Sequence, residues 1–308
     1  MELHQLQYLV RIAELGSIKA VARELGVVPS AVSRQLALLE EEFGTSLLNR
    51  HPAGVTLTDA GMAMAAQARL ALRHVDSAVA AARDARFSGM VGVGMAATTA
   101  ALLAKPFAVA MQERYPGIRL HLVEALAGHL HDMLRDRRLD LAVLYQMDVG
   151  SQWSVMPILC ETLFLIARRG LLPVSDGEAV QVSDLAGVPL ILTSKSHGLR
   201  RLVDAAFQRA GLAPVVGMEV DGLPTLMSLV RQGEYATIQP GAAVVATGDH
   251  ELCVYPMADP LLRRTNMITS VSDDELSPAA LAARVVLEDL MRELVSAGRW
   301  PGARLHDK

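Results

Sequence analysis

Glycines divide the first part of the chain into three short helical patterns, and this constrains the fold more than any other feature. Residues 3–15 carry apolar side chains at helical spacing and end at a glycine. Ser17 is a good N-cap for a second helix over 18–25, and Gly26 follows it as a turn. A third helix begins at Pro29, because the missing N–H of proline needs no partner at a helix start. Three short helices with a glycine turn between the second and third are typical of a helix-turn-helix.

The third helix is predicted to present polar side chains to solvent. Its apolar stripe leaves Ser30, Ser33, Arg34 and Gln35 exposed. In a helix-turn-helix, the N-terminal end of this helix enters the major groove of DNA. There Arg34 can donate two hydrogen bonds to the edge of one guanine, and Gln35 can form two hydrogen bonds with the edge of one adenine.

Residues 47–58 are predicted to form a small hairpin wing beside these helices. Two short predicted strands flank a turn at Pro52–Gly54. Arg50 lies in the first of these strands and is placed to contact phosphate or the minor groove. The wing therefore extends the predicted contact with DNA.

The charge of this segment gives no support to DNA binding. The whole chain has a net charge of −4. A DNA-binding domain is expected to be basic, and residues 1–58 are not. Their bases are Arg11, Lys19, Arg23, Arg34 and Arg50, and their acids are Glu2, Glu14, Glu24, Glu40, Glu41 and Glu42. The acids cluster at 40–42, whereas Lys19, Arg34 and Arg50 can share one face, so the prediction depends on pattern.

A long helix is predicted to follow the wing, from Thr58–Asp59 to about residue 86. Small and apolar residues recur along it at alternating steps of four and three, which is the spacing of a coiled-coil seam. We therefore expect residues 59–88 to join two protomers. The alternative is an amphipathic helix packed on its own domain. The predicted seam comprises Gly61, Ala65, Ala68, Leu72, Val75, Val79 and Ala82.

From Gly89 onward the sequence alternates between predicted strands and helices, which is typical of an α/β domain. Strands are expected over 91–95, 118–123, 139–144, 163–167, 189–192, 215–220, 235–238, 252–255 and 265–270. Helices are expected over 99–115, 129–137, 199–210, 223–231 and 277–295. The chain crosses near Cys160 and returns near Arg263, giving two lobes of about 89–160 with 268–300 and 161–267. A cleft between two such lobes commonly binds a small molecule.

Composition and motifs exclude several other classes of protein. A chain of 308 residues is too long for one core, and no apolar run reaches the roughly 18 residues of a membrane span. The N-terminus lacks the basic segment of a secretory signal, so a cytoplasmic protein is expected. The string from Gly92 to Ala97 outlines a dinucleotide site, but its glycines fall within the predicted strand. His129 and His131 lie about 200° apart on a helix and cannot share one ion. We expect no enzyme, cofactor, metal site or disulfide.

Several motifs resemble those of LysR-type transcriptional regulators, in the order and spacing of that family. The resemblance covers the whole chain, and two stretches of the α/β part are similar to the nitrogen-assimilation-control subgroup. The family motifs are Leu6–Leu9, Ser17–Ala22, Ala31–Leu36, Leu39–Glu40, Gly54–Gly61, Tyr115–Ile118 and Arg138–Val143, and the subgroup motifs are Gly198–Val203 and Leu276–Ala280.

The resemblance implies an N-terminal winged helix-turn-helix over 1–58, a long linker helix, and a two-lobed, periplasmic-binding-protein-like effector domain over 89–308. It also implies that Pro29, Ser30, Ser33 and Arg34 meet double-stranded DNA, and that Arg50 is the arginine of the wing. The expected assembly is a homodimer or a homotetramer that bends its operator, with RNA polymerase as a further partner. Val28–Pro29 departs from the family, which often has a polar pair ending in glutamine there. The operator sequence therefore does not carry over.

The resemblance places a small-molecule effector between the lobes, against the helix start at Ala97, Thr98 and Thr99. Helix N-termini favour anions, and the matching start on the second lobe is also rich in hydroxyl groups. A small carboxylate or similar anion is therefore expected. The alternative is that these hydroxyl groups only cap helices. The predicted effector-binding residues are Ala97, Thr98, Thr99, Gly128, Thr193, Ser194 and Ser196.

Two other functions stay open at this stage. One is a solute-binding or enzymatic α/β protein with an unrelated helical domain, which a secretion signal or a catalytic set would favour. The other is a regulator of the same fold that acts without a ligand. Residues 233–237 suggest it, because the family usually has a glycine-rich hydrophobic run there.

Overall fold

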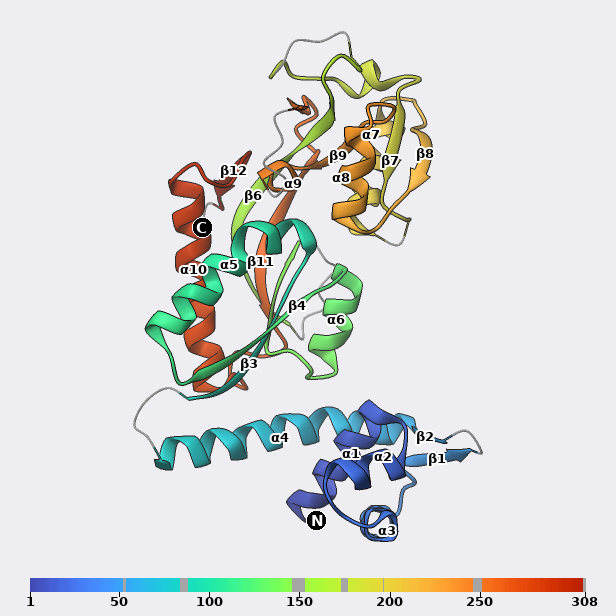
Figure 1. The fold of residues 1–308 in the computed structure, drawn as a ribbon, viewed down its shortest axis with the longest axis vertical. Helices are drawn as coiled ribbons and strands as arrows, with labels where there is room; N and C mark the ends of the chain where they lie inside the picture. The colour runs from blue at the N-terminus through green and yellow to red at the C-terminus, as the bar shows by residue number, and fades with distance from the viewer. Residues whose placement is uncertain are drawn as a thin grey trace.

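The computed structural model describes residues 1–51, 54–83, 88–145, 153–172, 177–195, 197–245 and 251–306. Figure 1 shows an N-terminal helical domain, a long helix, and an α/β domain of two lobes. The predicted fold class is confirmed. Among the described helices, none combines the length and the apolar character that crossing a membrane requires.

The N-terminal domain contains the predicted three helices and wing. Ser17 caps the second helix by accepting from the backbone N–H of Ala20 at 3.3 Å. The helices enclose an apolar core that includes Leu9, Val32 and Leu36, none of which is exposed. The elements are α1 (Leu3–Leu15), α2 (Ile18–Glu24), α3 (Pro29–Phe43), β1 (Leu48–His51) and β2 (Gly54–Leu57).

The long helix α4 (Asp59–Arg83) packs its first half against α1 of the same protomer. A Cβ atom at Gly61 would lie 2.1 Å from the backbone oxygen of Leu47, so only glycine fits this crossing. Ala65 and Ala68 are 1% and 3% exposed. The prediction that these two alanines form a seam between protomers is wrong, because the α1 side of the same chain already buries them.

The second half of the predicted seam remains accessible. Leu72 is half-buried beside Ala68, and Val75 is also half-buried. Val79 is exposed. The helix itself is about 38 Å long, from its 25 residues at roughly 1.5 Å each.

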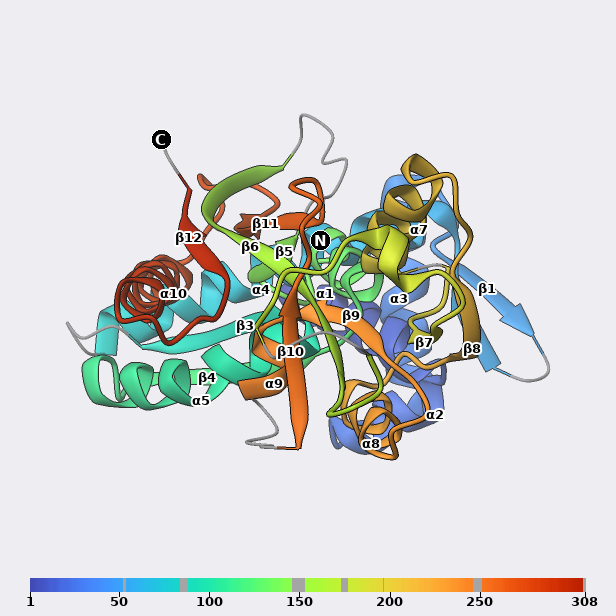
Figure 2. The same ribbon diagram turned by 90° about the horizontal axis from the view of Figure 1, so that it is seen from above.

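Lobe I is a sheet covered by helices on both faces. Strands β4, β3 and β5 run parallel, and β11 pairs antiparallel with β5. Helices α5 and α10 lie side by side on one face, and α6 covers the other (Figures 1 and 2). The elements are β3 (Gly89–Met95), α5 (Ala97–Arg114), β4 (Ile118–Glu124), α6 (Ala127–Arg135), β5 (Leu141–Tyr145), β11 (Arg263–Ser270), α10 (Pro278–Ser296) and β12 (Ala303–Leu305).

Lobe II is smaller and has two apolar clusters, one beneath α7 and one beneath α8. Its strands β7 and β8 run parallel, and β9 and β10 pair with the far end of β6. The elements are a short 3-10 helix (Val182–Leu185), β7 (Pro189–Leu192), α7 (Gly198–Arg209), β8 (Val215–Glu219), α8 (Leu223–Arg231), β9 (Thr237–Pro240), α9 (Ala242–Val245) and β10 (Leu252–Pro256).

Two antiparallel strands connect the lobes. Strand β6 (Ser154–Arg168) pairs with β11 and β12 along its first part, and with β9 and β10 along its last part. The predicted crossing points near Cys160 and Arg263 therefore lie inside β6 and β11. The cleft opens on one side of this two-stranded connection.

Candidate functional site: a DNA-binding face and a cavity between the lobes

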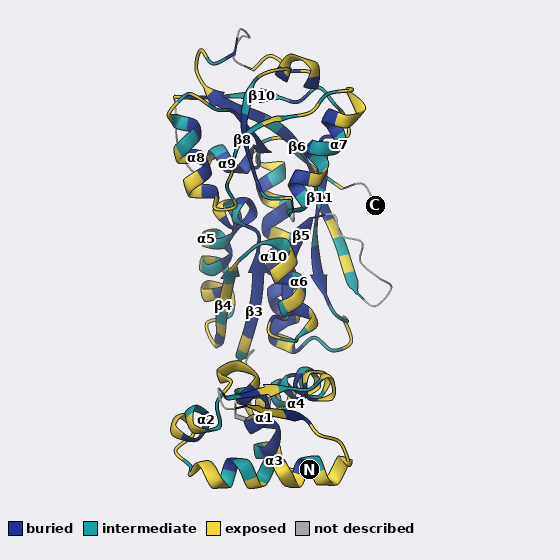
Figure 3. Ribbon diagram, turned by 90° about the vertical axis from the view of Figure 1, so that its right-hand side faces the viewer, coloured by how far each residue is buried: buried dark blue, intermediate teal, exposed yellow. Residues whose placement is uncertain are grey.

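Helix α3 lies across the end of the molecule that is farthest from the α/β domain (Figures 1 and 3). Its outer face is exposed. Of the predicted DNA-contacting residues, Lys19, Pro29, Ser30, Arg34 and Arg50 are exposed, and Ser33 is half-buried. The N-cap residue of α3, Val28, makes no side-chain hydrogen bond to the helix start.

Several acids of this domain are engaged in contacts within the protein. Arg11 pairs with both Glu14 and Glu24. Glu40 accepts hydrogen bonds from the backbone N–H groups of Leu47 and Leu48, at 2.7 and 3.1 Å. The carboxylates of these three acids are therefore already bonded to groups of the protein.

The exposed bases on the DNA-binding side are not neutralised in this way. Within the described residues, Lys19, Arg34 and Arg50 have no acidic partner. These three bases are therefore available to phosphate groups, which the total charge of the domain does not reveal.

Gln35 is oriented inward and not toward DNA. Its side-chain oxygen accepts a hydrogen bond from Gln5 of α1 at 3.0 Å, and Gln35 is half-buried. A fork on adenine needs both the oxygen and the nitrogen of the amide. Gln5 occupies one of the two acceptor sites of this oxygen. The structure thus shows Gln35 in contact with α1, and its reading of adenine stays a prediction.

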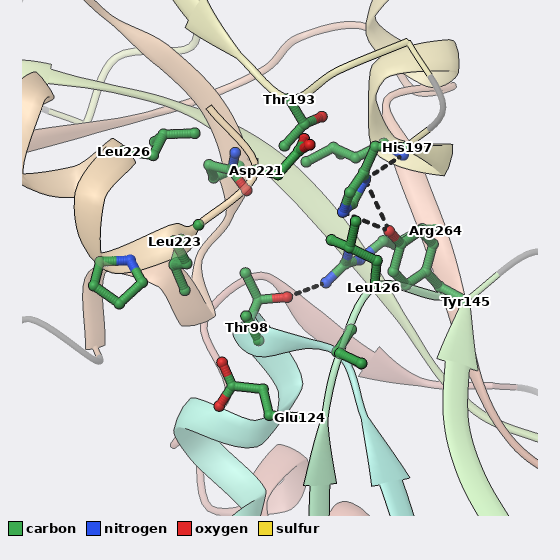
Figure 4. A pocket seen from close by; sticks show the side chains of 17 residues that line it. Thr98, Glu124, Leu126, Tyr145, Thr193, His197, Asp221, Leu223, Leu226 and Arg264 are labelled. Carbon is green, nitrogen blue, oxygen red and sulfur yellow. Dashed lines mark hydrogen bonds between the residues drawn. The ribbon is translucent and has the colours of Figure 1, made fainter. Parts of the chain in front are cut away.

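A cavity of about 310 Å³ lies between the two lobes. Figure 4 shows side chains from both lobes around it. The lining residues are Ala96, Ala97, Thr98, Glu124, Ala125, Leu126, Tyr145, Thr193, His197, Leu199, Asp221, Gly222, Leu223, Pro224, Leu226, Gln239 and Arg264.

Three helices begin at this cavity without a side-chain cap. The N-cap residues of α5, α6 and α8 are Ala96, Leu126 and Gly222, and none of them bonds to its helix start through a side chain. All three residues line the cavity. The first N–H groups of a helix have no partner inside the helix, and the N-terminus carries a partial positive charge. The cavity wall is therefore suited to a negatively charged group.

Arg264 forms the floor of the cavity and is only 2% exposed. Its Nε donates to Oε1 of Glu161 at 2.5 Å, and its Nη2 donates to the hydroxyl oxygen of Thr98 at 2.7 Å. The guanidinium carbon lies 4.2 Å from the centre of the Tyr145 ring. Glu161 is fully buried and also accepts from Asn266 and Trp300. The network joins β6, β11, α5 and β5 at the connection between the lobes.

A hydrogen bond also connects β5 of lobe I to the start of α7 in lobe II at the cavity wall. The Tyr145 hydroxyl lies 3.1 Å from Nδ1 of His197, the N-cap residue of α7. That nitrogen accepts from the backbone N–H of Leu199, so the tyrosine hydroxyl donates to it. Burial, and then the charge of Arg264, lowers the pKa of His197, so the imidazole is neutral at pH 7. Burial also raises the pKa of Tyr145, which keeps its proton.

The structure brings three of the predicted effector-binding residues together at the cavity: Ala97, Thr98 and Thr193. Thr99 is buried behind them. Gly128 lines a separate small hollow with His129 and Asp132. Neither of these two residues lines the cavity, so their predicted role needs correction.

The backbone N–H of Ser194 donates to Asp221, at the rim of the cavity, at 2.8 Å. Ser194 itself does not line the cavity, which is a further correction. Ser196 lies outside the described residues.

Sequence reasoning missed most of the polar groups of the cavity. Glu124 ends a strand and Asp221 follows one, and ligands of α/β domains commonly bind at the carboxyl ends of strands. That rule could have selected both. No sequence signal marks Arg264, because it depends on a partner more than a hundred residues away along the chain.

A winged helix-turn-helix with a free basic face, joined to a two-lobed domain with a cavity, defines a DNA-binding regulator with a sensing domain. Residues 3–62 match the family described as bacterial regulatory helix-turn-helix protein, lysR family. Residues 84–292 match the LysR substrate binding domain. The chain belongs to the LysR family of transcriptional regulators, which is not a family of enzymes.

Relatives agree with the resemblance to the nitrogen-assimilation-control subgroup. The nitrogen assimilation regulatory protein nac of Escherichia coli (strain K12) is 32% identical over 246 residues, 79% of each chain. The nac protein of Klebsiella aerogenes is 29% identical and covers 94% of this chain and 95% of its own.

Solved structures match over the whole chain. A full-length OxyR of Pseudomonas aeruginosa superposes with a TM-score of 0.75 at 23% identity, over 95% of both chains. CbnR in complex with its target DNA superposes with a TM-score of 0.64 at 23% identity, over 94% of this chain and 100% of that one.

Proposed function

We propose that this regulator reads its operator through α3 and the wing, and that a small anion bound between the lobes changes its DNA binding or its activation of transcription. The observation that carries the second part is the cavity at which three uncapped helices begin. A small carboxylate would accept from the N–H groups at the start of α5. The Thr98 hydroxyl accepts from Arg264 and keeps its own proton to donate.

In this proposal Arg34 reads base edges, with Ser30 and Ser33 beside it. Pro29 lies at the start of the same helix and makes apolar contact. Lys19 and Arg50 contact phosphate. Exposure of these side chains and the absence of acidic partners among the described residues support this assignment. Arginine is the residue best suited to guanine, because it donates two parallel hydrogen bonds to O6 and N7.

The contacts between α4 and lobe I supply a route from ligand to DNA. Arg69 donates to the backbone oxygen of Asp136 at 2.8 Å. Arg73 donates to the backbone oxygen of Arg137 at 2.9 Å and lies 3.2 Å from a carboxylate oxygen of Asp140. Asp140 directly precedes β5, which ends at the cavity with Tyr145. A change in the lobes would thus reach the helix that carries the DNA-binding domain, with a typical coupling of about 1–3 kcal/mol.

We propose that the working assembly is a homodimer or a homotetramer. The exposed part of α4 around Val79 is available to a second protomer. Two DNA-binding domains would meet half-sites about one helical turn, roughly 34 Å, apart. The regulator would act in the cytoplasm, where bacterial DNA lies, with RNA polymerase as its further partner.

A regulator without ligand control has less support. The unusual segment around Tyr235 does not line the cavity. Tyr235 instead packs on Gly217, where a Cβ atom would lie 2.3 Å from its ring. This departure from the family therefore lies outside the lining of the cavity.

Fluorescence anisotropy tests the DNA-binding part. The purified protein is titrated with the intergenic DNA beside its own gene and with random DNA of equal length, at several salt concentrations. We expect Arg34→Ala to weaken binding to the intergenic fragment by about 1–3 kcal/mol and binding to random DNA far less. Arg119→Ala, which removes an exposed arginine of β4 remote from α3, is the matched control.

The outcome separates the roles of Arg34. An equal loss on both DNAs would mean that Arg34 contacts phosphate and not bases. No binding of the wild-type protein to either DNA at low salt would overturn the proposal.

A further inference from the structure

Two carboxylates face the same cavity from opposite lobes. Glu124 is the last residue of β4 in lobe I, and Asp221 lies between β8 and α8 in lobe II. Both residues line the cavity, and Figure 4 places Glu124 below the open space and Asp221 above it. Both residues are solvent-exposed, and within the described residues the Glu124 side chain has no hydrogen-bond or ionic partner. The carboxylate of Asp221 accepts from the backbone N–H of Ser194, which carries no charge.

No positive side chain of the cavity compensates these two charges. Arg264 is the one arginine among the lining residues, and its charge is paired with buried Glu161. His197 is neutral at pH 7, because burial and Arg264 lower its pKa although Asp221 acts in the opposite direction. A ligand with a carboxylate alone would therefore meet the helix N-termini together with two carboxylates, one on each lobe, that no cationic side chain of the lining balances.

One side of the cavity also carries apolar side chains. Leu126 comes from lobe I, and Leu199, Leu223 and Leu226 come from lobe II. The cavity volume of about 310 Å³ lies at the lower end of the roughly 300–1,000 Å³ that is typical of small-molecule pockets. A ligand that fills it is small and has an aliphatic body.

We propose that the effector is a small zwitterion, such as a free amino acid with an aliphatic side chain. This inference rests on the proposed function of the same cavity. The carboxylate of the ligand accepts from the N–H groups at the start of α5 and from the Thr98 hydroxyl. Its ammonium group lies between Glu124 and Asp221, and its side chain packs on the leucines.

The placement of the carboxylates also gives the ligand a means to close the cleft. Two like charges on facing lobes repel each other as the lobes approach. An ammonium group between them replaces this repulsion by two attractions, one to each lobe. A ligand without that group leaves the repulsion in place, so it cannot favour the closed arrangement to the same degree.

Titration calorimetry on the full chain tests this with three matched probes. These are leucine, its analogue without the amino group (4-methylpentanoate), and its analogue without the carboxylate (3-methylbutylamine). Alanine, valine, isoleucine and methionine extend the series. Each protein is also titrated onto the intergenic DNA, so that DNA binding is measured independently of the cavity.

We expect at least one of the five amino acids to bind, and to bind at least about tenfold more tightly than its two truncated analogues. Glu124→Gln and Asp221→Asn should each reduce the affinity for that amino acid by about fivefold or more. Both variants should leave the affinity for 4-methylpentanoate unchanged or increase it, because each removes a carboxylate that repels the carboxylate of this probe. Glu113→Gln, an exposed change of the same kind on α5 outside the cavity, should alter neither.

Three results would overturn the inference. One is equal affinity for the amino acid and its deaminated analogue. Another is unchanged amino-acid binding in both cavity variants. The third is no binding of any of the five amino acids up to about 10 mM. If DNA binding persists in these cases, the zwitterion is refuted while the DNA-binding function stands, whereas loss of wild-type DNA binding refutes the proposed function itself.

Discussion

Replacing Glu161 by glutamine should destabilise the effector domain more than any surface change. Glu161 is 0% exposed and Arg264 is 2% exposed, so the pair has almost no access to water. Removing one partner of a buried ion pair costs about 3–5 kcal/mol, because the remaining charge stays buried without compensation. The amide oxygen of glutamine can still accept from Asn266 or Trp300, so the loss arises mainly at Arg264.

The magnitude translates into a large change in melting temperature. For a domain of 150–250 residues, 1 kcal/mol shifts Tm by about 2–4 °C, so Glu161→Gln should lower Tm by about 6–20 °C. Calorimetry or circular dichroism on the full chain measures this, and urea unfolding gives the free energy. The control is Glu293→Gln, whose partner Arg299 lies at the surface. It should cost less than about 1 kcal/mol.

A second variant separates charge from packing. Glu161→Gln combined with Arg264→Met replaces the pair by groups without charge, and should recover part of the lost stability. A Tm for Glu161→Gln within about 2 °C of wild type would refute the reasoning, since it corresponds to a cost of no more than about 1 kcal/mol. It would mean that Arg264 finds compensation elsewhere.

Two further predictions concern the helix crossing and the histidine between the lobes. Gly61→Ala should destabilise the DNA-binding domain by more than about 1 kcal/mol, because the added Cβ meets the Leu47 backbone at 2.1 Å. Gln67→Ala at an exposed position of the same helix is the control and should cost little, since both residues favour helix; equal unfolding curves for Gly61→Ala and wild type would contradict the prediction. For His197, the folded pKa lies below the usual value of 6.5, so the folded state binds fewer protons. The contribution of His197 to the free energy of unfolding is then fully present above pH 6.5, and it is lost as the pH falls below this value. His197→Asn keeps a good N-cap but does not titrate, and should flatten the pH dependence of Tm between pH 7 and pH 5; an identical slope in wild type and variant would refute the assignment.

The elements of the fold were largely predictable, because glycine and proline mark their ends. The strand Pro189–Leu192 and the helix Leu223–Arg231 have the bounds predicted for them. The seam on α4 was predicted wrongly at Ala65 and Ala68. Small apolar residues at steps of three and four fit a second protomer and the chain's own α1 equally well.

The cavity was only partly predictable, for a different reason. Thr98 and Thr193 could be selected because hydroxyl groups at helix starts are a local signal. The pair of Glu161 and Arg264 joins residues that are far apart in sequence, and a charge inside a strand pattern suggests an exposed face. Which carboxylates share a cavity depends on how two lobes meet, and no local pattern contains that information.

The continuous strands between the lobes have a mechanical consequence. Strand β6 has 15 residues and spans about 50 Å at roughly 3.3 Å per residue. Its pairing with β11 is interrupted at one place, the irregularity at Asn266/Met267. Paired strands bend and twist as an elastic ribbon, whereas a loop rotates freely, and such an irregularity concentrates the twist.

If ligand binding closes the cleft as proposed, the paired strands would bend and store elastic energy. That energy would help the lobes to reopen when the ligand leaves, without a second signal. A stiffer or softer ribbon at this one irregularity would reset the ligand concentration at which the regulator responds, while every contact to ligand and DNA stayed the same.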